Sequence, residues 1–145
     1  EIAGKREKIE PELGSSIHGY DIKTGAGGLI DIEFAAQYLQ LAYGHDHPTL
    51  RSRKTTEVLE AAAADRLADH SALATLSEGY RFLRRLEHRM RIVHDRPVHT
   101  LPSDLDELHV LARRSGHDSG DSLRASFDHW TGEIRQAYRQ VLGLA

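Results

Sequence analysis

A single lysine lies in a glycine-rich stretch that leads directly into a helical pattern. Lys23 is followed by Gly25, Gly27 and Gly28, and a helix is expected to begin at Leu29. Backbone amides that no side chain covers, the positive end of a helix dipole and a nearby ammonium all favour an anion such as phosphate. We therefore expect Lys23 and the three glycines to lie near a phosphate group. The alternative is a tight turn that needs glycine only for a positive φ.

Three acidic residues flank this lysine and its glycines. Asp31 and Glu33 are two positions apart, so in a strand they would share a face and could hold one Mg²⁺. In a helix they point roughly 200° apart and cannot. The surrounding pattern favours a helix, so we expect no metal site and interpret Asp21, Asp31 and Glu33 as acids that order the loop or border a cleft, with Glu33 a candidate partner of Lys23.

The histidines suggest a metal centre that the spacing does not support. Three His-Asp dipeptides, at 45–46, 94–95 and 117–118, resemble the dipeptide of HD phosphohydrolases. Such a centre needs further His and Asp ligands that converge from other helices. All three dipeptides fall at expected helix ends or turns, so we expect no bound metal and keep a metallohydrolase only as a third hypothesis.

A cluster of arginines lies on the longest expected helix. Arg81, Arg84 and Arg85 are interleaved with acids at the spacing of ion pairs within a helix. The pairs predicted are Glu78 with Arg81, Arg84 with Glu87, and Glu87 with Arg91. A solvated, ion-paired face is the first interpretation. In the alternative, Arg81, Arg84 and Arg85 form a basic face that meets an acidic partner or phosphates.

The composition excludes several classes of protein. With 145 residues the chain suits one domain with a hydrophobic core, and it has 22 acidic and 19 basic residues, a formal charge of -3. That charge argues against a dedicated nucleic-acid binder. The absence of cysteine excludes disulfides and thiolate chemistry. No apolar run could span a membrane and no secretion signal is present, so we expect a cytoplasmic protein.

The hydrophobic periodicity predicts helices and no strand. Apolar residues recur at spacings of three and four, which indicates amphipathic helices whose short connections favour antiparallel neighbours. We expect an all-α bundle of five to six antiparallel helices with no sheet, and Ser103 as a helix N-cap with Asp106 as its capping-box partner. The expected helices cover residues 1–13, 29–43, 55–67, 69–94, 104–115 and 121–142.

Several segments resemble one family of enzymes. Residues 21–34, Asp-Ile-Lys-Thr-Gly-Ala-Gly-Gly-Leu-Ile-Asp-Ile-Glu-Phe, closely resemble a segment of the glutamine synthetase adenylyltransferases, two-headed enzymes that adenylylate and deadenylylate glutamine synthetase. Further segments agree in the same order, so the resemblance spans nearly the whole chain. They are residues 37–41, 48–51, 80–89, 95–102 and 111–116.

The resemblance implies that residues 1–145 are one helical domain of a larger two-headed enzyme. In that family such a bundle follows a nucleotidyltransferase domain, as it also does in the uridylyltransferase of the PII signal protein. The catalytic signature belongs to the preceding domain and is missing here, so we expect no catalytic residue in this chain and no activity from it alone. The isoleucine at position 30 favours the C-terminal, adenylylating half.

The leading hypothesis follows from this resemblance. The chain is expected to be an accessory and regulatory domain of an adenylyltransferase that uses ATP and Mg²⁺ to transfer AMP to a tyrosine of glutamine synthetase and removes it by phosphorolysis. Lys23 and the glycines would face the nucleotide cleft, and the expected partners are glutamine synthetase, PII and the nucleotidyltransferase domain. The alternative is an interaction bundle that docks PII or glutamine synthetase without touching nucleotide.

Overall fold

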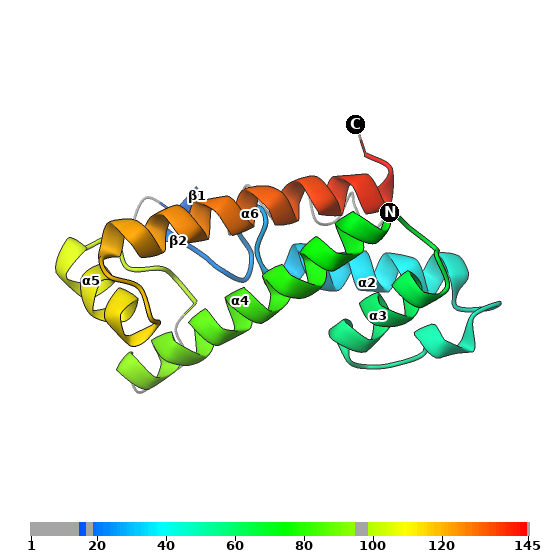
Figure 1. Ribbon diagram of the computed structural model, residues 1–145, viewed down its shortest axis with the longest axis horizontal. Helices are drawn as coiled ribbons and strands as arrows, with labels where there is room; N and C mark the ends of the chain where they lie inside the picture. Colours follow the sequence, from blue (N-terminus) through cyan, green and yellow to red (C-terminus); the bar gives the residue numbers. More distant parts are fainter. Residues whose placement is uncertain (1–14, 17–18, 95–98, 145) are drawn as a thin grey trace.

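The fold is an elongated bundle of helices (Figure 1). The computed structural model describes residues 15–16, 19–94 and 99–144, so the helix predicted over residues 1–13 lies outside the described residues. The elements are β1 Ser15–Ser16, β2 Gly19–Tyr20, α2 Leu29–Tyr43, the 3-10 helix η2 Pro48–Leu50, α3 Thr55–Ala64, α4 His70–His94, α5 Leu105–Arg114 and α6 Gly120–Leu142.

The predicted all-α class is confirmed. Within the described ranges, the extended structure amounts to the two-residue strands β1 and β2, which pair antiparallel with Ser15 opposite Tyr20, and an isolated bridge between Asp21 and Thr100. These short pairings add no layer to the bundle. Their effect is local, because they fix the chain just before α2 begins.

The long helix α6 is the centre of the bundle, since it contacts α2, α4 and α5. It crosses α4 in the opposite direction, while α5 covers one end of the pair and α2 and α3 lie toward the other (Figure 1). On α4, Gly79 permits the close crossing, because a Cβ there would lie 2.5 Å from Cγ1 of Ile134. Large side chains with almost no exposed surface fill the space between the helices: Leu39, Leu59, Leu76, Leu83, Met90, Phe127, Ile134 and Tyr138.

Helix boundaries mostly follow the predicted periodicity. Helix α2 has the predicted bounds, and α4 and α6 begin within one residue of prediction. Helix α3 ends at Ala64 rather than at residue 67, because the chain turns through Arg66 at φ 57° and the Leu67 amide closes back on the Ala62 carbonyl (3.0 Å). None of the helices in the described part is both long and apolar enough to cross a membrane.

The predicted N-cap of α5 is wrong by one residue. The cap is Asp104, whose Oδ2 accepts a hydrogen bond from the Glu107 amide (3.1 Å), and not Ser103 with Asp106. Both pairs have the spacing of a capping box, so the pattern alone fits either register. The observed register places a carboxylate at the positive end of the helix dipole, where a negative charge is stabilising.

The two candidate caps can be separated by substitution. Because Asp104 satisfies an otherwise unpaired helix amide, we expect Asp104→Ala to lower the free energy of unfolding by about 1 kcal/mol. Ser103→Ala should change it by only a few tenths of a kcal/mol, since Ser103 is exposed. Urea unfolding of both variants measures the difference, and a larger loss for Ser103→Ala would contradict this cap.

Candidate functional site

The glycine-rich segment forms a compact turn, which we call the glycine elbow and define as residues 20–31. Asp21 orders its first half: Oδ1 accepts hydrogen bonds from the amides of Lys23 (2.9 Å) and Thr24 (3.0 Å), and its carbonyl accepts one from Gly25 (2.8 Å). Aspartate commonly closes turns in this way, by bonding the backbone two residues ahead. The side chain of Lys23 therefore leaves the chain from a fixed turn.

The glycines of the elbow are needed for close packing. Gly27 has φ +76°, and an added Cβ there would overlap the carbonyl oxygen of Thr131 on α6. A Cβ on Gly28 would lie 2.7 Å from the carbonyl oxygen of Ile22, and one on Gly25 would overlap the ring of Tyr20. All three glycines are buried. The elbow can rest directly on the backbone of α6 only because Gly27 lacks a side chain, and Gly25 and Gly28 allow the turn to fold closely on itself.

Asp31 joins the elbow to α6. Its carboxylate is fully buried, accepts a hydrogen bond from the Gly27 amide (2.6 Å) and forms an ion pair with Arg135 (3.2 Å between Oδ2 and Nη1). The Arg135 guanidinium also lies over the ring of Tyr138, 5.2 Å from its centroid. The Asp31 carboxylate thus binds both α6, through Arg135, and the elbow, through the Gly27 amide.

The backbone amides of the elbow are largely committed inside the chain. In addition to the amides bonded to Asp21 and Asp31, Gly28 donates to the Gly25 carbonyl, and Leu29 and Ile30 donate to the carbonyls of Ile22 and Lys23 (2.9 Å each). Of the residues predicted to lie near phosphate, Lys23 is exposed, whereas Gly25, Gly27 and Gly28 are buried. Any anion at this site would therefore meet the Lys23 ammonium rather than a cradle of glycine amides.

Glu33 belongs to a cluster of charged residues between α2 and α4. Burial raises the pKa of the half-buried Glu33 carboxyl above its ordinary value of 4.5, while Lys23 and Arg84 act to lower that pKa and Glu87 acts to raise it. Glu87 is only 6% exposed and contacts both Arg84 (2.7 Å) and Nδ1 of His99 (3.2 Å). The His99 carbonyl in turn accepts a hydrogen bond from the Ile22 amide (2.7 Å), which links the cluster to the elbow.

The two acids of the pair 31 and 33 face different neighbours, as a helical spacing requires. Asp31 bonds to α6, whereas the charged neighbours of Glu33 include Arg84 and Glu87 of α4. They do not converge on one point. The described residues also contain no group of three or more His, Asp and Glu side chains arranged to hold a metal ion.

The arginines predicted as a basic face are partly neutralised. Arg84 pairs with Glu87 as predicted (2.7 Å), but Arg81 pairs with Glu60 of α3 (3.5 Å) and not with Glu78 of its own helix. Arg85 donates from Nε to the Arg81 carbonyl (3.3 Å). Arg81 therefore links α4 to α3, whereas Arg84 is paired within α4.

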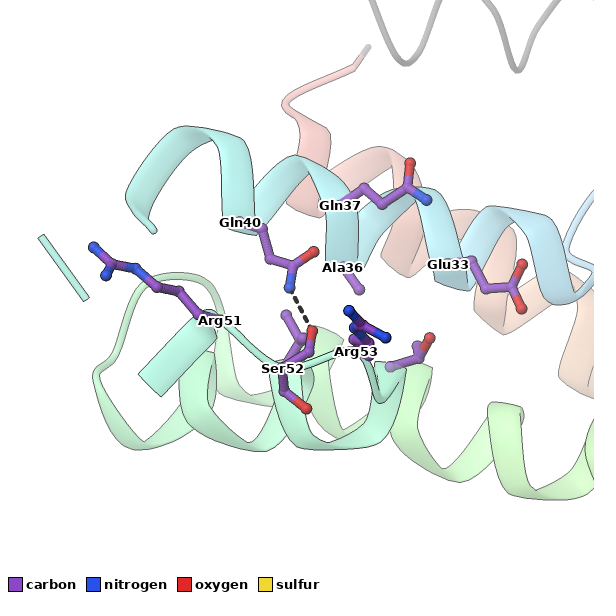
Figure 2. A pocket seen from close by; sticks show the side chains of 9 residues that line it. Glu33, Ala36, Gln37, Gln40, Arg51, Ser52 and Arg53 are labelled. Carbon is purple, nitrogen blue, oxygen red and sulfur yellow. Dashed lines mark hydrogen bonds between the residues drawn. The ribbon is translucent and has the colours of Figure 1, made fainter. Parts of the chain in front are cut away.

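A polar groove of about 580 Å³ lies beside Glu33, between α2 and the segment that leads into α3. Glu33, Gln37 and Arg53 line the groove, and Figure 2 shows the hydrogen bond from Gln40 to the Ser52 carbonyl (2.7 Å). Gln40 also donates a hydrogen bond to the Leu50 carbonyl (2.7 Å). Three residues of the basic run at positions 51–54, Arg-Ser-Arg-Lys, line this groove. That run could have indicated the groove from the sequence, but our predictions did not include it. The positive charge of Lys23 acts to lower the pKa of Glu33, a residue that lines the groove, so the ammonium lies near this groove.

Comparison with known proteins identifies the family. A family model described as GlnD PII-uridylyltransferase matches residues 4–144. The chain belongs to this family. The resemblance predicted from the sequence is likewise confirmed, because the similar curated proteins are bifunctional glutamine synthetase adenylyltransferase/adenylyl-removing enzymes.

Three of these relatives show how much of each protein is shared. The protein of Cutibacterium acnes is 37% identical over 141 residues, which is 97% of this chain and 14% of the relative. That of Ralstonia nicotianae is 41% identical over 86% of this chain and 13% of the relative. That of Rhodopseudomonas palustris is 41% identical over 74% and 11%. This member of the GlnD PII-uridylyltransferase family therefore spans about one seventh or less of the relatives it matches.

The close contact at Gly27 makes a sharp stability prediction. Gly27 and Gly116 both have positive φ, at +76° and +83°, but a Cβ on Gly116 would meet nothing within 4 Å. We expect Gly116→Ala to cost about 1 kcal/mol of unfolding free energy for the backbone conformation alone. Gly27→Ala should cost roughly 2–3 kcal/mol more because α6 must shift. Equal losses in chemical denaturation would contradict the close approach.

The raised pKa of Glu33 predicts a pH-dependent stability. The folded chain holds the Glu33 proton more tightly than the unfolded chain, so stability falls as pH rises from the ordinary pKa of 4.5 toward the folded value. We expect Glu33→Gln to raise the melting temperature near pH 7 and to leave it unchanged near pH 3, where both states are protonated. The exposed Glu133→Gln serves as control. An equal shift at both pH values would contradict the burial of Glu33.

Proposed function

We propose that this chain is the helical domain that accompanies a nucleotidyltransferase domain in a glutamine synthetase adenylyltransferase. The parent enzyme would transfer AMP from ATP to a tyrosine of glutamine synthetase and remove it by phosphorolysis. Two findings support this proposal: the family match over residues 4–144, and relatives that are named for both activities. The chain covers a small share of those relatives, so the reaction is assigned to the parent and not to this domain.

In this proposal the glycine elbow borders the nucleotide cleft and presents Lys23 to a phosphate group. The observation that carries it is the contrast between an exposed Lys23 side chain and the largely buried, internally hydrogen-bonded turn beneath it. Because the turn fixes the backbone of Lys23, only the side chain has to be ordered when its ammonium meets developing phosphate charge. The Asp31–Arg135 pair and the Asp21 turn would serve this role as positioning groups.

The ATP and Mg²⁺ of the reaction would be held by the nucleotidyltransferase domain. Mg²⁺ prefers several carboxylate and water oxygens in octahedral geometry. Asp31 is bonded to Arg135 and Gly27, and Glu33 lies among Lys23, Arg84 and Glu87, so these two acids do not suit a shared metal. We assign no metal ligand to this chain and limit its contribution to charge and position at the edge of the cleft.

The role of Lys23 can be tested in the full-length parent enzyme. Loss of one charge-assisted contact to phosphate should lower kcat/KM for adenylyl transfer by about 10- to 100-fold in Lys23→Ala, with Lys23→Arg retaining most activity. Lys54→Ala, an exposed lysine at the start of α3, should match wild type. Thermal melting confirms that each variant is folded.

The result also separates the two candidate functions. Wild-type kinetics in Lys23→Ala would contradict the nucleotide-cleft role and would favour the interaction bundle that docks PII or glutamine synthetase. Pull-down of PII and of glutamine synthetase by the parent enzyme, with and without Lys23→Ala, then tests that alternative directly.

A further inference from the structure

A second groove, of about 390 Å³, lies between α4, the turn that joins α5 to α6, and α6 itself. No residue of the glycine elbow lines it, so it is independent of the function proposed above. Its volume falls within the range of small-molecule pockets. The side chains that matter for its chemistry are Phe82, Arg85, Arg89, Ser115, His117 and Trp130.

One wall of this groove is aromatic. Phe82 and Trp130 stack with their ring centroids 6.0 Å apart and their planes at 27°. Both rings are only partly buried, so the pair presents apolar ring surface to the groove. Leu86 and Leu123 are buried beneath it. A flat aromatic ligand is the natural complement of such a wall, because offset stacking adds to the gain from apolar burial.

The groove also carries positive charge, which comes from two arginines on the same face of α4. Phe82, Arg85 and Arg89 follow each other at the helical spacings of three and four, which places all three on the side of α4 that lines the groove. Both are exposed, and across the described ranges neither forms an ion pair, whereas Arg81 and Arg84 do. No acidic residue lines the groove, although the chain as a whole carries a charge of -3. The groove therefore selects an anion.

Two polar atoms at the end of the groove lack partners. Within the part of the chain that the structure describes, Ser115 Oγ and His117 Nδ1 are sealed from solvent and form no hydrogen bond. Buried polar groups are rarely left unsatisfied in proteins, because each costs the free energy of its lost hydration. Both residues line this groove, so a rotation of either side chain toward the groove would bring its polar atom to a ligand bound there.

We propose that this groove binds a mononucleotide. The base stacks on the Phe82–Trp130 wall, the phosphate lies between the guanidiniums of Arg85 and Arg89, and Ser115 and His117 bond the polar edge of the ligand. Phosphate alone would leave the aromatic wall unused, and a nucleoside alone would leave both arginines unused. The ring and the charge are therefore required together.

Trp130 gives a direct readout, because it is the only tryptophan in the sequence. We titrate the 145-residue chain with AMP, adenosine and inorganic phosphate, following tryptophan emission and, in parallel, the heat of binding. AMP should bind saturably, at least tenfold more tightly than adenosine or phosphate, and more weakly as salt is added. No binding of AMP by either method, or equal binding of adenosine or of phosphate, would overturn the proposal.

Substitutions then locate the site. Arg85→Gln and Arg89→Gln should each weaken AMP binding about tenfold, the effect of one charge-assisted hydrogen bond. Phe82→Leu, which keeps apolar volume and removes the ring, should also weaken it. Arg91→Gln removes the same charge from the same helix outside the groove and should bind AMP like wild type. Undiminished binding in both Arg85→Gln and Arg89→Gln would place the nucleotide elsewhere and overturn the assignment.

Discussion

The arrangement of this bundle depends on one buried carboxylate. Asp31 lies 104 positions before its partner Arg135, and its side chain has no exposed surface. Removing a charge from water is expensive, and the cost is offset only where the charge is paired and its remaining lone pairs are hydrogen-bonded. Arg135 and the Gly27 amide meet both conditions. The start of α2, the glycine elbow and α6 are consequently held in a single geometry.

The shape of the elbow follows from this pairing. For Asp31 to reach Arg135, the chain before α2 must lie against the backbone of α6, and only glycine fits there. The same packing commits the elbow's amides to partners inside the chain and leaves Lys23 on the outer side. A rigid turn with one outward cation differs chemically from a flexible loop of open amides: it offers a single charge on a side chain that leaves the chain at a fixed point.

The helices could be predicted from the sequence because their apolar residues repeat with the helical period, and α2 has its predicted bounds for that reason. Where two local patterns fit the sequence equally well, the sequence could not predict which of them the structure uses. Ser103 and Asp104 both fit the capping spacing, and Arg81 finds its acid on α3 although Glu78 has the correct spacing on its own helix. Gly27 was ambiguous in the same way, because its close neighbour is Thr131, a residue far along the sequence that no local pattern indicates.

The separation of Asp31 from Arg135 also sets an order of assembly. At about 5–20 residues per second, a ribosome needs roughly 5–20 seconds to add the 104 positions between them. Throughout that interval the nascent elbow has no helix to rest on, and its aspartate stays hydrated. The local helices can form early, but this junction closes only on the arrival of α6. This contact cannot form before α6 has been made, so the region that carries Lys23 matures together with the packing of α6 on α2, α4 and α5.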